Sequence, residues 1–127
     1  MQKQVFEFMG RRIELWLHAA PDHMATLIKA NRMFYELDVL MKCREIYLPG
    51  TAVVDVGANI GNHSVFFGAV LGARVHAFEP YRPSFELLQM SLGKRGKSVG
   101  SRSFSRLPGL MGYDSLRLCR RHRPFRI

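Results

Sequence analysis

The segment Asp-Val-Gly-Ala-Asn-Ile-Gly at residues 55–61 combines residue types and a spacing that can bind a ligand. Gly57 and Gly61 permit backbone conformations and close approaches that a Cβ would block. A helical pattern follows at once, so the turn presents backbone N–H groups at a helix start, where polar ligand atoms can meet them. The segment therefore predicts a ligand-binding turn.

An acidic residue, Glu79, ends the next apolar run, 24 residues after Asp55. In parallel sheets the ligand crevice lies beyond the carboxyl ends of the strands, and both residues stand at such ends. A carboxylate there can accept two hydrogen bonds from a ribose diol. Because a buried strand has few structural reasons to end on Glu, we expect Glu79 to bind a ribose.

The pattern around the turn narrows the class of nucleotide ligand. A dinucleotide fingerprint needs glycine at three positions, G-x-G-x-x-G, and counting from Gly57 the second and third positions are Asn59 and Asn62. A phosphate-binding P-loop would need Gly-Lys-Ser/Thr after the turn, which is absent. The pattern therefore favours a nucleoside cofactor without phosphate, of which S-adenosylmethionine is the commonest, and it indicates no metal cluster.

The elements that must position these residues follow from hydrophobic periodicity. The β-branched run at residues 51–56 is typical of a strand buried on both faces. Residues 62–71 predict a helix with Gly72 as its C′ residue, residues 74–78 a second strand, and residues 84–89 the start of another helix. This order forms one βαβ unit of a parallel sheet.

The preceding segment, residues 1–50, predicts a hairpin and helices. Apolar side chains alternate in residues 5–9 and 13–17, which favours two strands around a glycine-bearing turn. Asp22 is a candidate N-cap of a first helix. Residues 35–46 place apolar side chains at i, i+3 and i+4, which predicts a second, amphipathic helix.

Charge separates the last segment, residues 91–127, from the rest. The chain has a net charge of +9, and residues 1–90 hold nine basic and nine acidic side chains, so the whole excess lies in residues 91–127. That segment is rich in Arg, Ser and Gly and has no apolar period. We expect residues 1–50 and the βαβ unit at 51–90 to fold, and residues 91–127 to form a disordered basic tail.

The bulk composition favours a soluble cytoplasmic protein. The longest uncharged apolar run, residues 65–73, is far shorter than the ~20 residues of a membrane span. Charged residues interrupt the N-terminus, so no signal peptide is predicted. Cys43 and Cys119 lack metal-ligand spacing and are interpreted as free thiols.

Three motifs in order resemble the FkbM family of methyltransferases: Phe-Tyr-Glu at residues 34–36, the turn with its following helix at 55–67, and Val-His-Ala-Phe-Glu-Pro at 75–80. The resemblance covers roughly residues 34–90. It implies an α/β, Rossmann-like methyltransferase fold with a parallel sheet, S-adenosylmethionine as cofactor, and methylation of hydroxyl oxygens on small molecules or saccharides. Because the family's sheet continues where this chain becomes basic, we expect a sheet truncated after its second strand, with Val53, Val54, Val75 and Phe78 partly exposed to water.

The cofactor-binding candidates leave alternatives open. Asp55 either approaches the methionine moiety or caps the turn, and the two Asn side chains either touch the ligand or serve as turn and cap residues. Glu36 with Tyr35 either reaches the cofactor's amino-acid end or the acceptor, or caps a helix, and His63 is expected to be a packing or surface histidine. The full set of cofactor-binding candidates is Glu36, Asp55, Gly57, Ala58, Asn59, Gly61, Asn62, Glu79, Pro80 and Tyr81.

The function expected from these features is S-adenosylmethionine-dependent O-methylation, with the catalytic base unassigned. Two alternatives remain. One is a truncated fragment of a methyltransferase that binds the cofactor without transferring its methyl group. The other is a nucleic-acid-binding protein that uses the basic tail, which the missing aromatic pattern disfavours.

Overall fold

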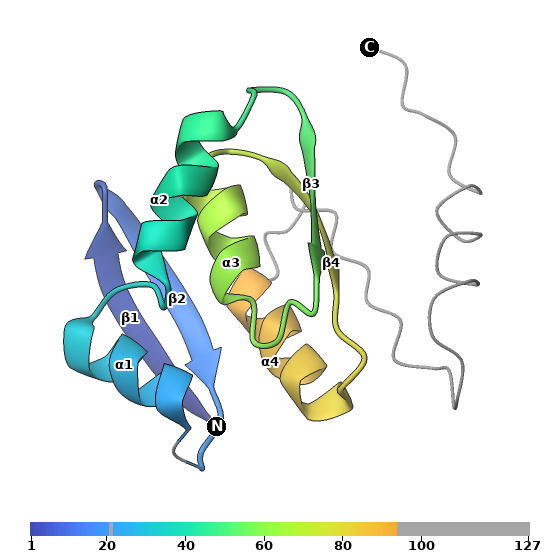
Figure 1. Ribbon diagram of the computed structural model, residues 1–127. Coiled ribbons are helices and arrows are strands. Elements are labelled where there is room, and N and C mark those ends of the chain that lie inside the picture. The colour runs from blue at the N-terminus through green and yellow to red at the C-terminus, as the bar shows by residue number, and fades with distance from the viewer. Residues whose placement is uncertain (21, 94–127) are drawn as a thin grey trace.

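The computed structural model describes residues 1–20 and 22–93 as a mixed α/β structure with one small parallel sheet (Figure 1). Residues 94–127, which hold most of the predicted basic tail, lie outside the described residues. The elements in chain order are β1 (Gln2–Phe8), β2 (Arg11–Leu17), α1 (His23–Asn31), α2 (Leu37–Ile46), β3 (Ala52–Val56), α3 (Asn62–Val65), η1 (Phe66–Val70), β4 (Arg74–Phe78) and α4 (Arg82–Leu92).

The predicted N-terminal hairpin is confirmed, with strands a few residues longer than the apolar alternation indicated. Strands β1 and β2 pair antiparallel, with Phe6 opposite Ile13. Met9 and Gly10 both have positive φ, 48° and 71°, as a two-residue hairpin turn matched to strand twist requires. Phe6, Ile13 and the two leucines of β2 are buried, so one face of the hairpin contributes to the core.

Helix α1 begins where its cap predicts. The Asp22 carboxylate accepts a hydrogen bond of 2.6 Å from the Ala25 N–H, which satisfies one of the unpaired donors of the first turn. Helix α2 begins at Leu37, two residues after the predicted start, because Glu36 has a left-handed backbone with φ 54° that a helix cannot include.

The parallel pair is the part of the fold that positions the predicted turn. Strands β3 and β4 are parallel, with Ala52 opposite Arg74 and Val56 opposite Phe78, as the βαβ pattern predicts. The predicted helix at 62–71 is present in two parts, because α3 continues into the wider π-helical turn η1. Such π turns are rare and often occur at functional sites.

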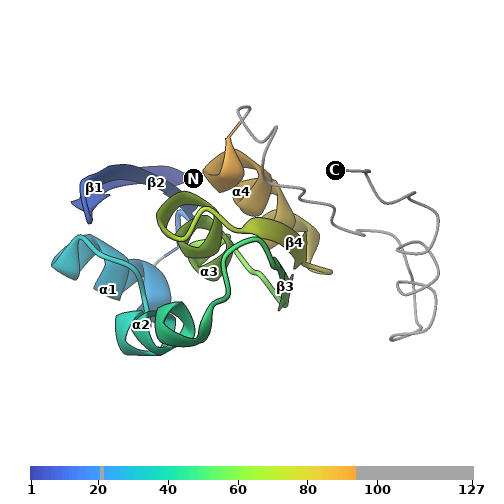
Figure 2. The same cartoon turned by 90° about the horizontal axis from the view of Figure 1, so that it is seen from above.

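Helices α3 and α4 lie between the hairpin on one side and the β3–β4 pair on the other (Figures 1 and 2). A large apolar cluster joins the hairpin to α1, α2, η1 and α4. A second, smaller cluster joins β4 and the turn to Leu88 of α4. The first cluster draws on residues from both the 1–50 and the 51–90 segments. Helix α4 faces both clusters and therefore links the hairpin to the sheet.

The expectation that β3 is buried on both faces is wrong. Val54 and Val56 are 62% and 80% exposed, whereas Val75 and Ala77 on the inner face of β4 are fully buried. Within the described residues, the helices cover one face of the pair, and two-sided burial needs a layer on each. The expected partial exposure of a two-stranded sheet is confirmed for Val53, Val54 and Phe78 but wrong for Val75.

Candidate functional site: a glycine turn at the carboxyl ends of two parallel strands

The turn after β3 is tied to the end of β4 by backbone hydrogen bonds. Gly57 and Ala58 both donate their N–H groups to the Phe78 carbonyl oxygen, at 2.8 and 3.0 Å. The Gly61 N–H donates to the Ala58 carbonyl at 2.8 Å, which closes the turn before α3. These three N–H groups serve the fold, so they do not form the open array of donors that the sequence indicated.

The two glycines of the turn are needed for different reasons. Gly57 has φ 81°, and a Cβ added there would meet nothing within 4 Å, so the backbone conformation alone requires glycine. Gly61 has φ 93°, and its added Cβ would lie 2.8 Å from Cδ1 of Leu88. Gly61 therefore also allows α4 to pack closely against the turn, while the space beside Gly57 is open to a ligand.

Glu79 has a structural role that sequence reasoning missed. Its side chain is buried, with the residue only 7% exposed. One carboxylate oxygen accepts a hydrogen bond of 2.8 Å from the Asn59 N–H, and the other accepts one of 2.7 Å from the Tyr81 N–H. The carboxylate thus ties the glycine turn to the start of α4. Each carboxylate oxygen can accept a further hydrogen bond, so a ligand hydroxyl could share this acceptor.

Asp55, the last acidic residue before the turn, is held by the first turn of α3. The buried Ser64 hydroxyl donates a hydrogen bond of 2.5 Å to Asp55 Oδ2. This contact joins the end of β3 to α3 across the turn. Because the Asp55 side chain is only half-buried, it also remains accessible to a ligand beside the turn.

Asn62 connects the turn to the segment before α2. Its buried side chain accepts a hydrogen bond of 3.0 Å from the Tyr35 N–H and donates one of 2.9 Å to the Tyr35 carbonyl. The Asn62 side chain, for which the sequence left open ligand contact or a turn and cap role, is thus engaged in two hydrogen bonds to Tyr35. They bring the Phe-Tyr-Glu motif beside the glycine turn, although the two are far apart in sequence.

The side chains of Glu36 and His63 are in contact at this junction. Glu36 Oε2 lies 3.3 Å from His63 Nε2, and the side chains are 45% and 33% exposed. The left-handed backbone of Glu36 is unusual, because the residue before a helix ordinarily has an extended conformation. Strained positions of this kind cluster at ligand sites. Sequence reasoning named both residues but not their contact.

The remaining candidates divide between the core and the surface. Ala58 is buried in the apolar cluster below the turn. Asn59 is exposed and has a left-handed backbone with φ 48°. Pro80 and Tyr81 are exposed. The Tyr81 backbone donates its N–H to Glu79 and accepts a hydrogen bond of 3.0 Å from the Phe85 N–H, while its exposed ring agrees with the alternative of a surface aromatic.

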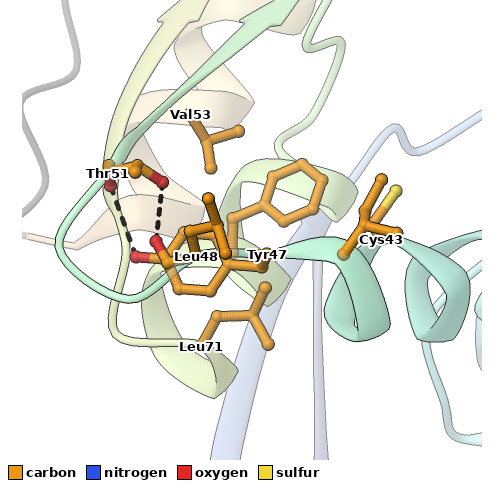
Figure 3. A pocket seen from close by; sticks show the side chains of 8 residues that line it. Cys43, Tyr47, Leu48, Thr51, Val53 and Leu71 are labelled. Carbon is orange, nitrogen blue, oxygen red and sulfur yellow. Dashed lines mark hydrogen bonds between the residues drawn. The ribbon is translucent and has the colours of Figure 1, made fainter.

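An apolar hollow that the sequence did not predict opens at the opposite end of β3. It has a volume of about 300 Å³, and Figure 3 shows side chains of α2, β3 and η1 converging on it. The Tyr47 hydroxyl donates to the Thr51 carbonyl at 3.3 Å beside it. Cys43 and Ile46, at i and i+3 on α2, were the sequence signal that could have indicated it. The residues that line the hollow are Cys43, Ile46, Tyr47, Leu48, Thr51, Val53, Phe67 and Leu71.

Two kinds of site are absent from the part of the chain that the structure describes. Its acidic, histidine and cysteine side chains form no group of three that could hold a metal ion. No helix in this part is long and apolar enough to cross a membrane.

Comparison with known proteins adds no assignment. No family model matches the chain, and no curated protein gives a significant match. The geometry around the turn and the resemblance of three motifs are therefore the basis on which a function can be argued.

Proposed function

We propose that this protein is an S-adenosylmethionine-dependent methyltransferase of Rossmann-like fold that acts on a hydroxyl oxygen of a small molecule or saccharide. The observation that carries the proposal is the position of Glu79. Its carboxylate lies against a glycine turn at the carboxyl ends of two adjacent parallel strands. Ligands of open α/β sheets bind at this edge.

The chemistry of the turn fits a nucleoside better than a phosphate ester. Glu79 offers an acceptor of the kind that a ribose diol needs. Residues 55–64 contain no Lys or Arg that could offset phosphate charge. Arg82, the nearest base after Glu79, is paired with Glu86 at 3.2 Å. A cofactor without phosphate would therefore meet little electrostatic cost at this edge.

The residues of the chain would bind and align the cofactor. Glu79 would hold the ribose, and the open space beside Gly57 would admit the rest of the ligand. When bound, S-adenosylmethionine supplies an electrophilic methyl group. The protein's contribution is then to hold an acceptor hydroxyl in line with that group, which lowers the barrier through proximity and orientation. The choice of oxygen as acceptor rests on the resemblance to the FkbM family.

Calorimetry on the full chain tests this proposal. S-adenosylhomocysteine should bind, and ATP at the same concentration should not compete with it. Glu79→Gln should weaken binding about tenfold, as expected for one hydrogen bond to a charged acceptor. Glu86→Gln, an exposed carboxylate on α4, is the matched control and should bind as the wild type does. Binding of NAD without binding of S-adenosylhomocysteine would refute the proposal.

A second candidate function, cofactor binding without methyl transfer, is favoured by the outer face of the β3–β4 pair. Val54 and Val56 are largely exposed on that face, so the described residues enclose the proposed ligand site at the strand ends from one side only. Methyl transfer from radiolabelled S-adenosylmethionine to a panel of sugars and phenols separates the two candidates. Turnover above background establishes transfer, whereas binding without turnover across the panel favours the second candidate.

A further inference from the structure

We propose that the open edge of β3 is a dimerisation surface on which a second copy of this chain docks. The two copies would pair their β3 strands antiparallel about a two-fold axis at Val54, which joins their two-stranded sheets into one continuous sheet. Pairing of this kind requires only backbone groups and apolar side chains, so it is independent of the proposed cofactor.

Four large apolar side chains lie exposed along this side of the molecule. Val54 and Val56 point from the outer face of β3, and Ile46 and Leu48, at the end of α2 and in the loop after it, are 79% and 68% exposed. Figure 2 shows α2 and β3 along the same side of the structure, with α4 on the other. These four residues, here named the β3 edge patch, present several hundred Å² of apolar surface, and patches of that size often mark interaction sites.

The backbone of β3 presents hydrogen-bonding groups at the same edge. The Gly57 N–H donates to the Phe78 carbonyl, so the trans peptide before Gly57 directs the Val56 carbonyl away from β4. Backbone direction alternates along a strand, so the N–H and C=O groups of Ala52 and Val54 also point away from β4. In the part of the chain that the structure describes, β4 is the only strand paired with β3, and these groups therefore form an open edge.

The edge lacks the features that protect exposed strands from pairing with other chains. Natural edge strands often carry charged side chains, proline or a bulge. The only charged residue of β3 is Asp55, which points to the inner face and accepts a hydrogen bond from Ser64. Arg74 and His76 lie on the outer face, but they belong to β4 and stand one strand away from the edge. The outer face of β3 itself is entirely apolar.

The sequence of β3 is self-complementary in one antiparallel register. With Val54 opposite the partner's Val54, Ala52 stands opposite the partner's Val56. All of these residues direct their backbone groups to the open edge, so each would join a hydrogen-bonded pair that exchanges both N–H···O=C bonds. Their side chains would meet as apolar cross-strand pairs, which stabilise a sheet. The two-fold axis closes the assembly at two copies.

The area of the patch sets the expected strength of the dimer. Stable specific interfaces bury about 1,200–2,000 Å² in total. Two copies of the β3 edge patch, together with the strand edges between them, supply about 1,000 Å², which is the low end for a specific interface. We therefore expect a weak dimer, whose population rises with protein concentration in the micromolar range.

Sedimentation equilibrium of the full chain, from low to several hundred micromolar, tests the dimer. The wild type should pass from monomer to dimer over this range. Val54→Lys should raise the dissociation constant about tenfold, because two lysines would stand opposite each other at the two-fold axis and repel. His76→Lys is the matched control, since it adds the same charge to the same face on the neighbouring strand, and it should dimerise as the wild type does.

Oxidative cross-linking tests the register independently. In a chain with Cys43 and Cys119 replaced by serine, Val54→Cys should give a disulfide-linked dimer, because Cα atoms of a hydrogen-bonded antiparallel pair lie about 5.5 Å apart. His76→Cys should not, because the two β4 strands would lie three strand spacings apart, roughly 14 Å. A disulfide spans at most ~7 Å between Cα atoms. Cysteine is close to valine in size, so this pair decides the question even if Val54→Lys fails to fold.

A chain that stays monomeric over the whole range refutes the dimer. Protection of the Val54 and Val56 amides from hydrogen exchange in that monomer would show that another segment of the same chain covers the edge. Equal cross-linking of both cysteine variants, or assemblies that grow beyond two copies, would also overturn the proposed pairing, which requires one register and a closed pair. A dimer that Val54→Lys leaves unchanged would place the interface elsewhere.

Discussion

Replacing Glu79 with glutamine should destabilise the fold, because the buried carboxylate joins two segments. The side chain accepts one backbone N–H from the turn at Asn59 and one from Tyr81 at the start of α4. Glutamine has nearly the same shape but only one acceptor atom. Whichever way its amide is turned, the NH₂ group faces one of the two backbone N–H groups.

The expected loss follows from that geometry. Glu79→Gln removes one charge-assisted hydrogen bond and leaves one N–H without its acceptor at a residue that is 7% exposed. Hydrogen bonds to charged groups contribute about 1.5–3 kcal/mol, and we expect a fall of about that size in the free energy of unfolding. This is a large share of the ~5–15 kcal/mol of a typical domain.

Urea unfolding of the full chain, followed by circular dichroism, measures the change. A loss of about 2 kcal/mol should lower the urea midpoint by roughly 1 M without changing the slope. Glu86→Gln is the control, because the exposed pair of Glu86 with Arg82 should contribute less than about 0.5 kcal/mol. If the two variants unfold at the same urea concentration, Glu79 does not hold the turn as we describe.

Three further changes test other parts of the structure. Gly61→Ala should lose about 1–3 kcal/mol more stability than Gly72→Ala, because both positions have positive φ but only at Gly61 would the new Cβ overlap a neighbour; equal losses in thermal unfolding would contradict this. Asn62→Ala should cost about 2 kcal/mol by removing two hydrogen bonds to the backbone of one residue, and Asn62→Asp should cost at least as much, because a carboxylate oxygen in place of the NH₂ group would face the Tyr35 carbonyl oxygen at a buried position. A hydrogen bond from Lys3 is the main cause that lowers the pKa of Glu14 below its ordinary value of 4.5. Any stability that the Glu14 carboxylate contributes is therefore present above pH 4.5 and is lost as the pH falls through the lowered pKa. Lys3→Met should raise the pKa of Glu14 measured by NMR titration, and an unchanged value would show that Lys3 is not the cause.

Local patterns in the sequence were enough to predict most of the elements. The strand at residues 74–78, the N-cap at Asp22 and the hairpin are present as expected, because each depends on residues close together in the chain. The parallel pairing also followed from the order of strand, turn, helix and strand. The π turn within the helix after Gly61 was not predictable, because no proline or glycine pattern in the sequence distinguishes it from an α-helix.

The types of the site residues were likewise visible in the sequence, but their partners were not. Glycine at 57 and 61 reflects local φ values, which the sequence can report. The contact of Glu79 with the Asn59 N–H joins residues 20 positions apart, and that of Asn62 with Tyr35 joins residues 27 apart. A side chain's partner over such distances depends on how the elements pack, so the structural role of Glu79 appeared only in the fold.

Residue order alone was sufficient to predict most of the secondary structure, the glycine turn and the acidic residue at the end of β4, because these depend on local sterics and hydrophobic period. The exposure of the outer face of β3 became visible only in the packed fold, since the β-branched run is the same whether one or two layers cover it. The contact between Glu36 and His63 likewise depends on packing, because Asn62 holds the segment before α2 against α3. Residue types limit which contacts are possible, but the packing of distant segments determines which of them form. The sequence of one segment alone therefore cannot predict its partners in another.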